Sequence, residues 1–90
     1  MTKTSLEYSQ IYAAASDLFG EIASDVYQTF VECDGKNPSR KDFGSSMAEC
    51  AIEQALFRNE GLAAIYEKLT APEIAKLERA LAKESLYYLN

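Results

Sequence analysis

The sequence contains no histidine and no tryptophan, and only two prolines and four glycines among its 90 residues. Without histidine, the most common general base of nucleophilic catalysis is missing. The few prolines and glycines leave little material for the turns of an all-β fold. No apolar run approaches the roughly 18 residues of a membrane-spanning helix. Because the first residues, MTKTSLE, lack the apolar stretch of a signal peptide, we expect a cytoplasmic protein.

The two cysteines, Cys33 and Cys50, are too few for the disulfide framework of a small secreted domain. Both fall on apolar helix positions, where a free thiol behaves as a small hydrophobic side chain. The sequence has no CxxC pair of the kind that binds zinc. We therefore expect both thiols to be reduced and at least partly buried, with a single disulfide as the alternative.

Length and turn signals predict one all-α domain over residues 1–90, folded as a small compact bundle of three or four helices. The segment 34–39, with the sequence DGKNPS, should end any helix before it. Thr70, followed by Pro72 and Glu73, predicts a capping box at the start of the last helix. A weaker break lies at residues 59–61.

Residues 5–33 show the clearest helical period. At about 100° per residue, the larger apolar side chains fall in one arc of roughly 120–140°, and the acidic side chains in an opposite arc of about 80°. The pattern persists past Gly20 and predicts one long amphipathic N-terminal helix. A break at Gly20 is the alternative, because glycine inside a helix costs about 1 kcal/mol relative to alanine. An unbroken helix of roughly 40 Å would exceed the diameter of the globule, which favours a homodimer.

Three shorter helices are expected after the first. The segment from 39 or 42 to 59 is apolar on two sides, as is typical of a central helix, and one of these sides contains Phe43, Met47, Cys50 and Phe57. A short helix follows over residues 62–69, and a last one runs from 71 or 72 to 88. The last helix has a basic stripe, formed by Lys76, Arg79 and Lys83. It also has an apolar strip that a small monomer could not easily cover, formed by Ala75, Ala82, Leu86 and Leu89.

The charge distribution is the most informative feature for function. Residues 1–35 contain six acidic residues and one basic residue, whereas residues 36–90 contain eight of each, so the net charge of −5 comes from the first helix. Like charges four residues apart destabilise a helix by roughly 0.2–0.5 kcal/mol per pair. We predict that this acidic stripe binds a basic surface on a larger protein. Its members are Glu7, Asp17, Glu21, Asp25 and Glu32. The alternatives are a merely solvated face and pairing with the protein's own basic stripe.

Two other surfaces are second candidates for a partner. Basic residues around the loop after the first helix would suit a dimeric helical DNA-binding regulator, but the acidic balance of the chain argues against nucleic acid. These residues are Lys36, Arg40 and Lys41. Tyr87 and Tyr88 should place one ring inward and one outward on the last helix, and such amphipathic rings are enriched in interfaces.

The sequence predicts no catalytic, cofactor or metal site. Glu49 and Glu53 are four residues apart, but a two-metal carboxylate site in a helical bundle also requires histidines. A small carboxylate-based enzyme or metal-binding module is therefore the least favoured alternative. We expect a non-enzymatic inhibitor, adaptor or regulatory subunit, without a cofactor or membrane partner. In size and charge alone, the chain resembles the small acidic inhibitors of phages and plasmids that occlude nucleic-acid-binding channels, so mimicry of nucleic acid is one form that binding could take.

Overall fold

The computed structural model describes residues 2–89, with the side chains from residue 8 onward. Within these residues all regular structure is helical: five α-helices, one short 3-10 helix and no strand. The elements are α1 Thr2–Ser16, α2 Phe19–Asp34, α3 Arg40–Arg58, α4 Glu60–Lys68, α5 Ala71–Ser85 and η1 Leu86–Tyr88. The all-α prediction is confirmed. The described α-helices number five rather than three or four, because the predicted first helix is divided into two.

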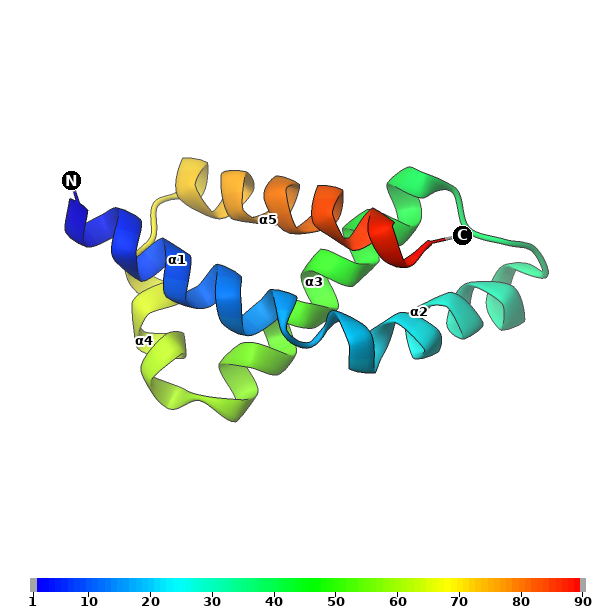
Figure 1. The fold of residues 1–90 in the computed structure, drawn as a ribbon, viewed down its shortest axis with the longest axis horizontal. Helices are drawn as coiled ribbons and strands as arrows, with labels where there is room; N and C mark the ends of the chain where they lie inside the picture. Colours follow the sequence, from blue (N-terminus) through cyan, green and yellow to red (C-terminus); the bar gives the residue numbers. More distant parts are fainter. Residues whose placement is uncertain (1, 90) are drawn as a thin grey trace.

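α3 is the central helix and packs against every other helix in the described chain. Figure 1 shows α1 and α5 running in the same direction, while α3 returns in the opposite direction. α4 lies at the end where α3 finishes, and α2 continues from α1 along the long axis of the molecule. The extents of 43 × 22 × 19 Å describe an elongated body. The apolar pattern on two sides of α3 therefore predicted its central position correctly.

Local hydrogen bonds define the two ends of the loop between α2 and α3. α2 stops at Gly35, whose φ of 72° lies in the left-handed region and whose N–H donates to the carbonyl of Val31. The hydroxyl of Ser39 then accepts a hydrogen bond from the Asp42 N–H at 3.1 Å and caps α3. The turn predicted at residues 34–39 is thus confirmed.

The last two helices also begin with side-chain caps. Asn59 Oδ1 accepts a hydrogen bond from the Gly61 N–H at 2.9 Å, at the weaker break read from the sequence. At the start of α5, Thr70 Oγ1 accepts from the Glu73 N–H, and Glu73 Oε1 accepts from the Thr70 N–H. The predicted capping box is therefore confirmed, and it fixes the direction in which α5 leaves α4.

The predicted continuous helix over residues 5–33 is wrong, because the chain is interrupted at Asp17 and Leu18. The Leu18 N–H bonds to the Ala15 carbonyl at 3.0 Å, three residues back, which tightens the helix locally to the 3-10 pattern. The Ser16 hydroxyl donates to the Ala13 carbonyl at 3.2 Å and competes with the regular backbone ladder.

The interruption lets the two halves pack against different neighbours. α1 packs on α3, α4 and α5, whereas α2 packs on α3 and η1. The adjacent residues Leu18 and Phe19 both become buried at the bend. Gly20, the position proposed for an alternative break, lies inside α2. The overlong helix that favoured a second chain is therefore absent.

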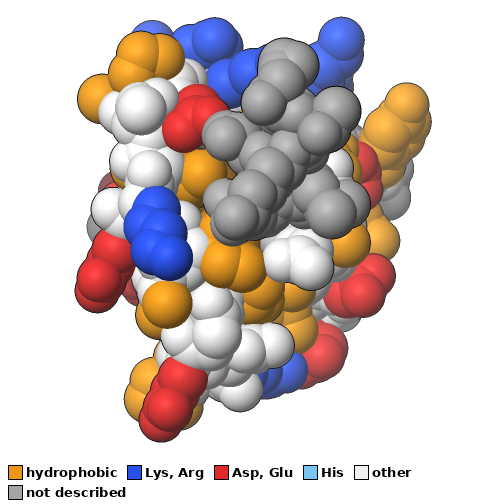
Figure 2. All heavy atoms as spheres, turned by 90° about the vertical axis from the view of Figure 1, so that its left-hand side faces the viewer, with side chains coloured by type: hydrophobic (Ala, Val, Ile, Leu, Met, Phe, Trp, Pro, Cys, Tyr) orange, Lys and Arg blue, Asp and Glu red, His pale blue; other side chains and the backbone are white. Residues whose placement is uncertain are grey.

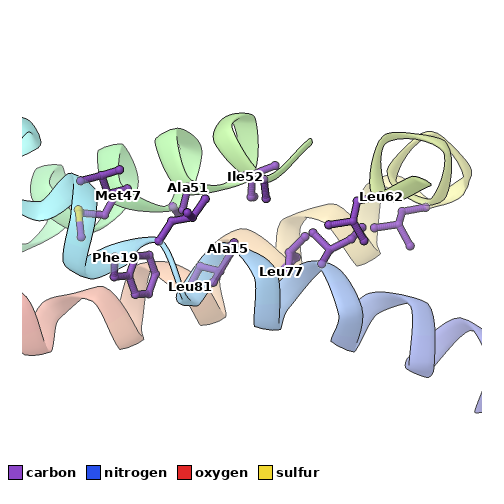
Figure 3. Close-up of a cluster of buried hydrophobic side chains, with 14 of the residues drawn as sticks. Ala15, Phe19, Met47, Ala51, Ile52, Leu62, Leu77 and Leu81 are labelled. Carbon is purple, nitrogen blue, oxygen red and sulfur yellow. The ribbon is translucent and has the colours of Figure 1, made fainter. Parts of the chain in front are cut away.

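The core combines small side chains of α3 with larger ones from its neighbours. Figure 3 shows Met47, Ala51 and Ile52 of α3 beside Phe19 of α2 and Leu81 of α5. All five are buried. The apolar side of α3 that was expected to include Phe57 does not extend that far, since this side chain is 87% exposed near the end of the helix.

α3 and α5 approach each other most closely at Gly44. A Cβ atom on Gly44 would lie 3.0 Å from the Ala82 carbonyl oxygen and 3.3 Å from the Ala82 Cβ. Ala82, Leu86 and Leu89 are partly buried against the core of the same chain. The apolar strip of α5, which was expected to need a second chain to cover it, is thus largely covered by α3 and its neighbours.

We predict that Gly44→Ala lowers the free energy of unfolding by about 1–3 kcal/mol, because the added methyl group pushes against backbone that cannot rotate away. Alanine's better helix propensity offsets part of this loss. Gly20→Ala is the matched control: a Cβ there meets nothing within 4 Å, so the change should be neutral or mildly stabilising. Urea unfolding of the two variants measures the difference, and equal stabilities would contradict a close α3–α5 contact.

Candidate functional site

The acidic stripe forms a solvent-exposed face on α2. Glu21, Asp25 and Glu32 are separated by four and seven residues, so they share one side of the helix, and all three are exposed. Asp17 is exposed in the turn that precedes α2. α2 itself contains no lysine or arginine. Glu7, the remaining predicted member, lies outside the residues whose side chains are described.

The described part of this acidic face contains one ion pair. Arg58 Nη2 of α3 lies 3.2 Å from Glu21 Oε1, and the two side chains are 52% and 59% exposed. Exposed pairs of this kind contribute about 0.2–1 kcal/mol. Glu32 accepts a hydrogen bond from Gln28 Nε2 at 3.1 Å, one turn earlier on the same helix. Most of the charge on the face is therefore left for solvent or for a partner.

The basic stripe of α5 does not neutralise the acidic face within the described residues. Lys76 Nζ instead lies 5.8 Å from the centroid of the Tyr8 ring of α1. Figure 2 shows the end of the molecule near α4, where lysine and arginine side chains gather along the upper edge over α5 and acidic side chains lie on the flanks. Below this edge, acidic and basic side chains lie near one another on the same face (Figure 2).

A groove of about 340 Å³ lies between α2 and α3. Half-buried side chains form its inner wall: Val26, Phe30 and Cys50. Exposed carboxylates form its edge: Asp34, Glu49 and Glu53. No basic side chain lines it. The sequence alone did not predict this groove, because only the packing of α3 beside α2 brings Glu49 and Glu53 next to the acidic helix.

Both cysteines line the groove and are free thiols. Burial raises the pKa of the Cys50 thiol, and the negative charges of Glu53, Asp25 and Glu49 raise it further. The prediction of partial burial is confirmed for Cys50 but wrong for Cys33, which is exposed. The reason is that the last turn of α2 lies beyond the covered part of the helix, and residues 32–37 are all exposed.

The groove contains carboxylates and thiols, but they do not converge on one point. The described residues contain no group of three or more cysteine, aspartate or glutamate side chains that could hold a metal ion. The carboxylates at its edge are exposed to solvent. The raised pKa of Cys50 means that this thiol keeps its proton more readily than an ordinary cysteine does. Chemically, the groove offers an apolar wall with negative charge along its edge.

The basic residues considered for DNA binding are exposed around the loop between α2 and α3. Lys36 lies in the loop, and Arg40 and Lys41 lie in the first turn of α3. Two exposed acidic residues, Asp34 and Asp42, flank this group in the sequence. The structure therefore places the basic loop next to carboxylates rather than on a uniformly basic surface.

The two C-terminal tyrosines differ in exposure, but the predicted inward ring is only partly covered, since Tyr88 is 46% exposed. Tyr87 is 85% exposed, whereas the ring of Tyr88 packs edge-on against Phe19 with 5.8 Å between centroids. Both line a hollow of about 480 Å³ together with Tyr12 and Glu84. The Tyr12 hydroxyl donates a hydrogen bond to Glu84, which raises the pKa of Tyr12 to about 12. Two of the polar groups that line this hollow, the Tyr12 hydroxyl and the Glu84 carboxylate, are thus paired with each other.

The chain matches no protein-family model, and no curated protein or solved structure is similar enough to it to count as a match. None of the helices in residues 2–89 combines the length and apolarity that crossing a membrane requires. The geometry of the acidic face and of its neighbouring groove therefore carries the functional argument.

We predict that Cys33 reacts with a soluble thiol reagent at least about tenfold faster than Cys50 in the native protein. Cys33 is exposed, whereas Cys50 is half-buried and its thiolate is disfavoured by nearby carboxylates. Labelling kinetics of Cys33→Ser and Cys50→Ser measure each thiol separately, and labelling in urea provides the unprotected rate. Equal native rates would contradict the placement of Cys50.

Proposed function

We propose that the protein is a non-enzymatic interaction module that presents the acidic face of α2 to a basic surface on a larger protein. The observation that supports this proposal is the exposure of Glu21, Asp25 and Glu32 on a helix without basic residues. A concentrated field of one sign speeds the encounter with a partner of opposite charge and selects its orientation. An inhibitor, adaptor or regulatory subunit would use such a surface.

Stability alone gives no reason for this arrangement. Glu21 and Asp25 are one turn apart and repel each other by roughly 0.2–0.5 kcal/mol. The ion pair between Glu21 and Arg58 recovers a similar amount, since both side chains are largely in solvent. A helix with interspersed lysines would be equally well solvated and more stable. Retention of the acidic face is best accounted for by binding.

The alternatives have less support from the geometry. A DNA-binding regulator would approach the phosphates through Lys36, Arg40 and Lys41, close to the carboxylates of Asp34 and Asp42. A carboxylate-based enzyme needs a desolvated acid or base, whereas the carboxylates of this face are exposed. In one form of this proposal the partner itself binds nucleic acid. The protein then occupies the partner's nucleic-acid-binding channel, as the small acidic inhibitors of phages and plasmids do.

We predict that the combined change Asp17→Lys, Glu21→Lys and Asp25→Lys weakens binding to the partner by tenfold or more, equivalent to about 1.4 kcal/mol. The measurement is affinity capture from the host with the parent and the variant as baits, followed by titration of the captured partner at several ionic strengths. Binding by the parent should weaken with salt, because screening reduces the attraction between the two surfaces.

The matched control is Glu60→Lys, Glu67→Lys and Glu78→Lys, which makes the same charge change at exposed positions of α4 and α5. It should bind the partner nearly as well as the parent. Equal loss in both variants would indicate a non-specific charge effect. Full binding by the α2 variant would move the interface to the basic loop or to Tyr87 and Tyr88, and retention on DNA itself would favour the regulator.

We also propose that the chain is cytoplasmic and forms homodimers. Its two free thiols support a reducing compartment. The side chain of Phe57, 87% exposed, supports self-association, because burial of such a ring against a second copy is favourable. We predict a dimer mass by light scattering at rising protein concentration, and a shift toward the monomer in Phe57→Ser. A monomer mass for the parent at every concentration would exclude a stable dimer.

A further inference from the structure

We propose that the groove between α2 and α3 holds a basic amphipathic helix of the partner, with the helix's apolar ridge against Phe30 and its lysine or arginine side chains at the carboxylate edge. This inference rests on the proposed function and specifies how the acidic face is used. It names one occupant for the groove, a helix that is apolar on one side and cationic beside it.

The helices are unevenly covered by their neighbours, and α2 has room beside it for one more helix. α1 packs extensively against three helices, α3, α4 and α5. Among the described elements, α2 packs extensively only against α3 and η1. Figure 1 shows the second half of α2 extending past the other helices, toward the end of the molecule formed by the loop. The groove lies along this stretch.

The residues that line the groove have helical spacing on both walls. Val26, Phe30 and Cys33 follow each other at intervals of four and three residues on α2 and form the apolar wall. Ser46, Cys50 and Glu53 have the same spacing on α3 and form a mostly polar wall. An amphipathic helix seated between them would lay its i, i+3, i+4 apolar side chains on the α2 wall and its polar side chains along α3. The half-buried state of Val26 and Phe30 leaves apolar area that such a helix would remove from water.

The charge at the edge selects a cationic helix. Asp34, Glu49 and Glu53 line the groove without a basic side chain among them. The raised pKa of the Cys50 thiol, caused by burial and by Glu53, Asp25 and Glu49, reports the same negative field inside it. The C-terminal end of α2 adds the negative end of its helix dipole and has no basic residue in its last turn. Asp25 and Glu32 of the acidic face directly precede the groove residues Val26 and Cys33 on α2, so the acidic face borders the groove.

The test uses a synthetic amphipathic helix of leucine and lysine that contains one tryptophan. The protein has no tryptophan, so fluorescence of the peptide reports its burial without interference from tryptophan in the protein. The control peptide has the same composition but a shuffled order without an apolar face. We expect the amphipathic peptide to bind, to shift its emission to the blue and to slow the labelling of Cys33 at least about threefold, whereas the control peptide should do none of these.

The groove variant Glu49→Gln with Glu53→Gln should weaken peptide binding by about tenfold, because each exposed charge pair contributes a few-fold. Both side chains are exposed and the changes preserve their shape, so the fold should persist, as circular dichroism would verify. The matched variant Glu60→Gln with Glu67→Gln removes the same charge on α4 and should bind as the parent does.

The outcomes separate the groove from the wider proposal. If the peptide binds without protecting Cys33, and only the Asp17, Glu21 and Asp25 variant weakens it, the groove inference is wrong and the acidic face remains the binding surface. If neither variant weakens binding, both are wrong. Protection of Cys33 by rising protein concentration alone would assign the groove to a second copy. Protection by spermidine but not by the peptide would assign it to a small cation.

Discussion

The close packing of α3 against α5 at Gly44 is the contact on which the rest of the structure depends. With no side chain at Gly44, the two helices approach until a methyl group would meet the Ala82 backbone at 3.0 Å. Buried alanines continue this narrow side of α3: Ala48, Ala51 and Ala55. Large side chains from the neighbouring helices fill the space that these small residues leave, which is how one helix can serve as the centre for all the others.

The position of α3 and α5 determines which surfaces remain open. α1, α3 and α5 pack against one another, and α4 packs against α1 and α3. Among the described elements, α2 packs extensively against α3 and the short 3-10 helix η1, and its apolar side is half-buried along Val26 and Phe30. The groove and the acidic face both result from this incomplete coverage. The packing of the core thus places the negatively charged part of the molecule at the end that has space for a partner.

The acidic face and the hollow near the C-terminus differ in how far their charged groups are paired within the chain. Among the described residues the acidic face has one partly exposed ion pair, from Glu21 to Arg58, while Lys76 lies over the Tyr8 ring. The hollow near the C-terminus is different, since Tyr12 and Glu84 satisfy each other. The charges of the acidic face are exposed, and the one ion pair that it makes among the described residues is exposed too, so little internal pairing opposes an interaction with an external cation.

The starts of the later helices could be predicted from the sequence, because they depend on hydrogen bonds between residues close in the chain. Tertiary packing decided the break between α1 and α2 and the groove between α2 and α3. Ser39, Asn59 and Thr70 cap helices through hydrogen bonds to residues two or three positions away, so their effect is readable from the local sequence. The apolar period through Leu18 looks continuous because both halves bury one side. Their neighbours differ, however, and only those neighbours require a bend. For the same reason the sequence indicated an acidic face but could not place Glu49 beside it, because the two helices meet only in the folded chain.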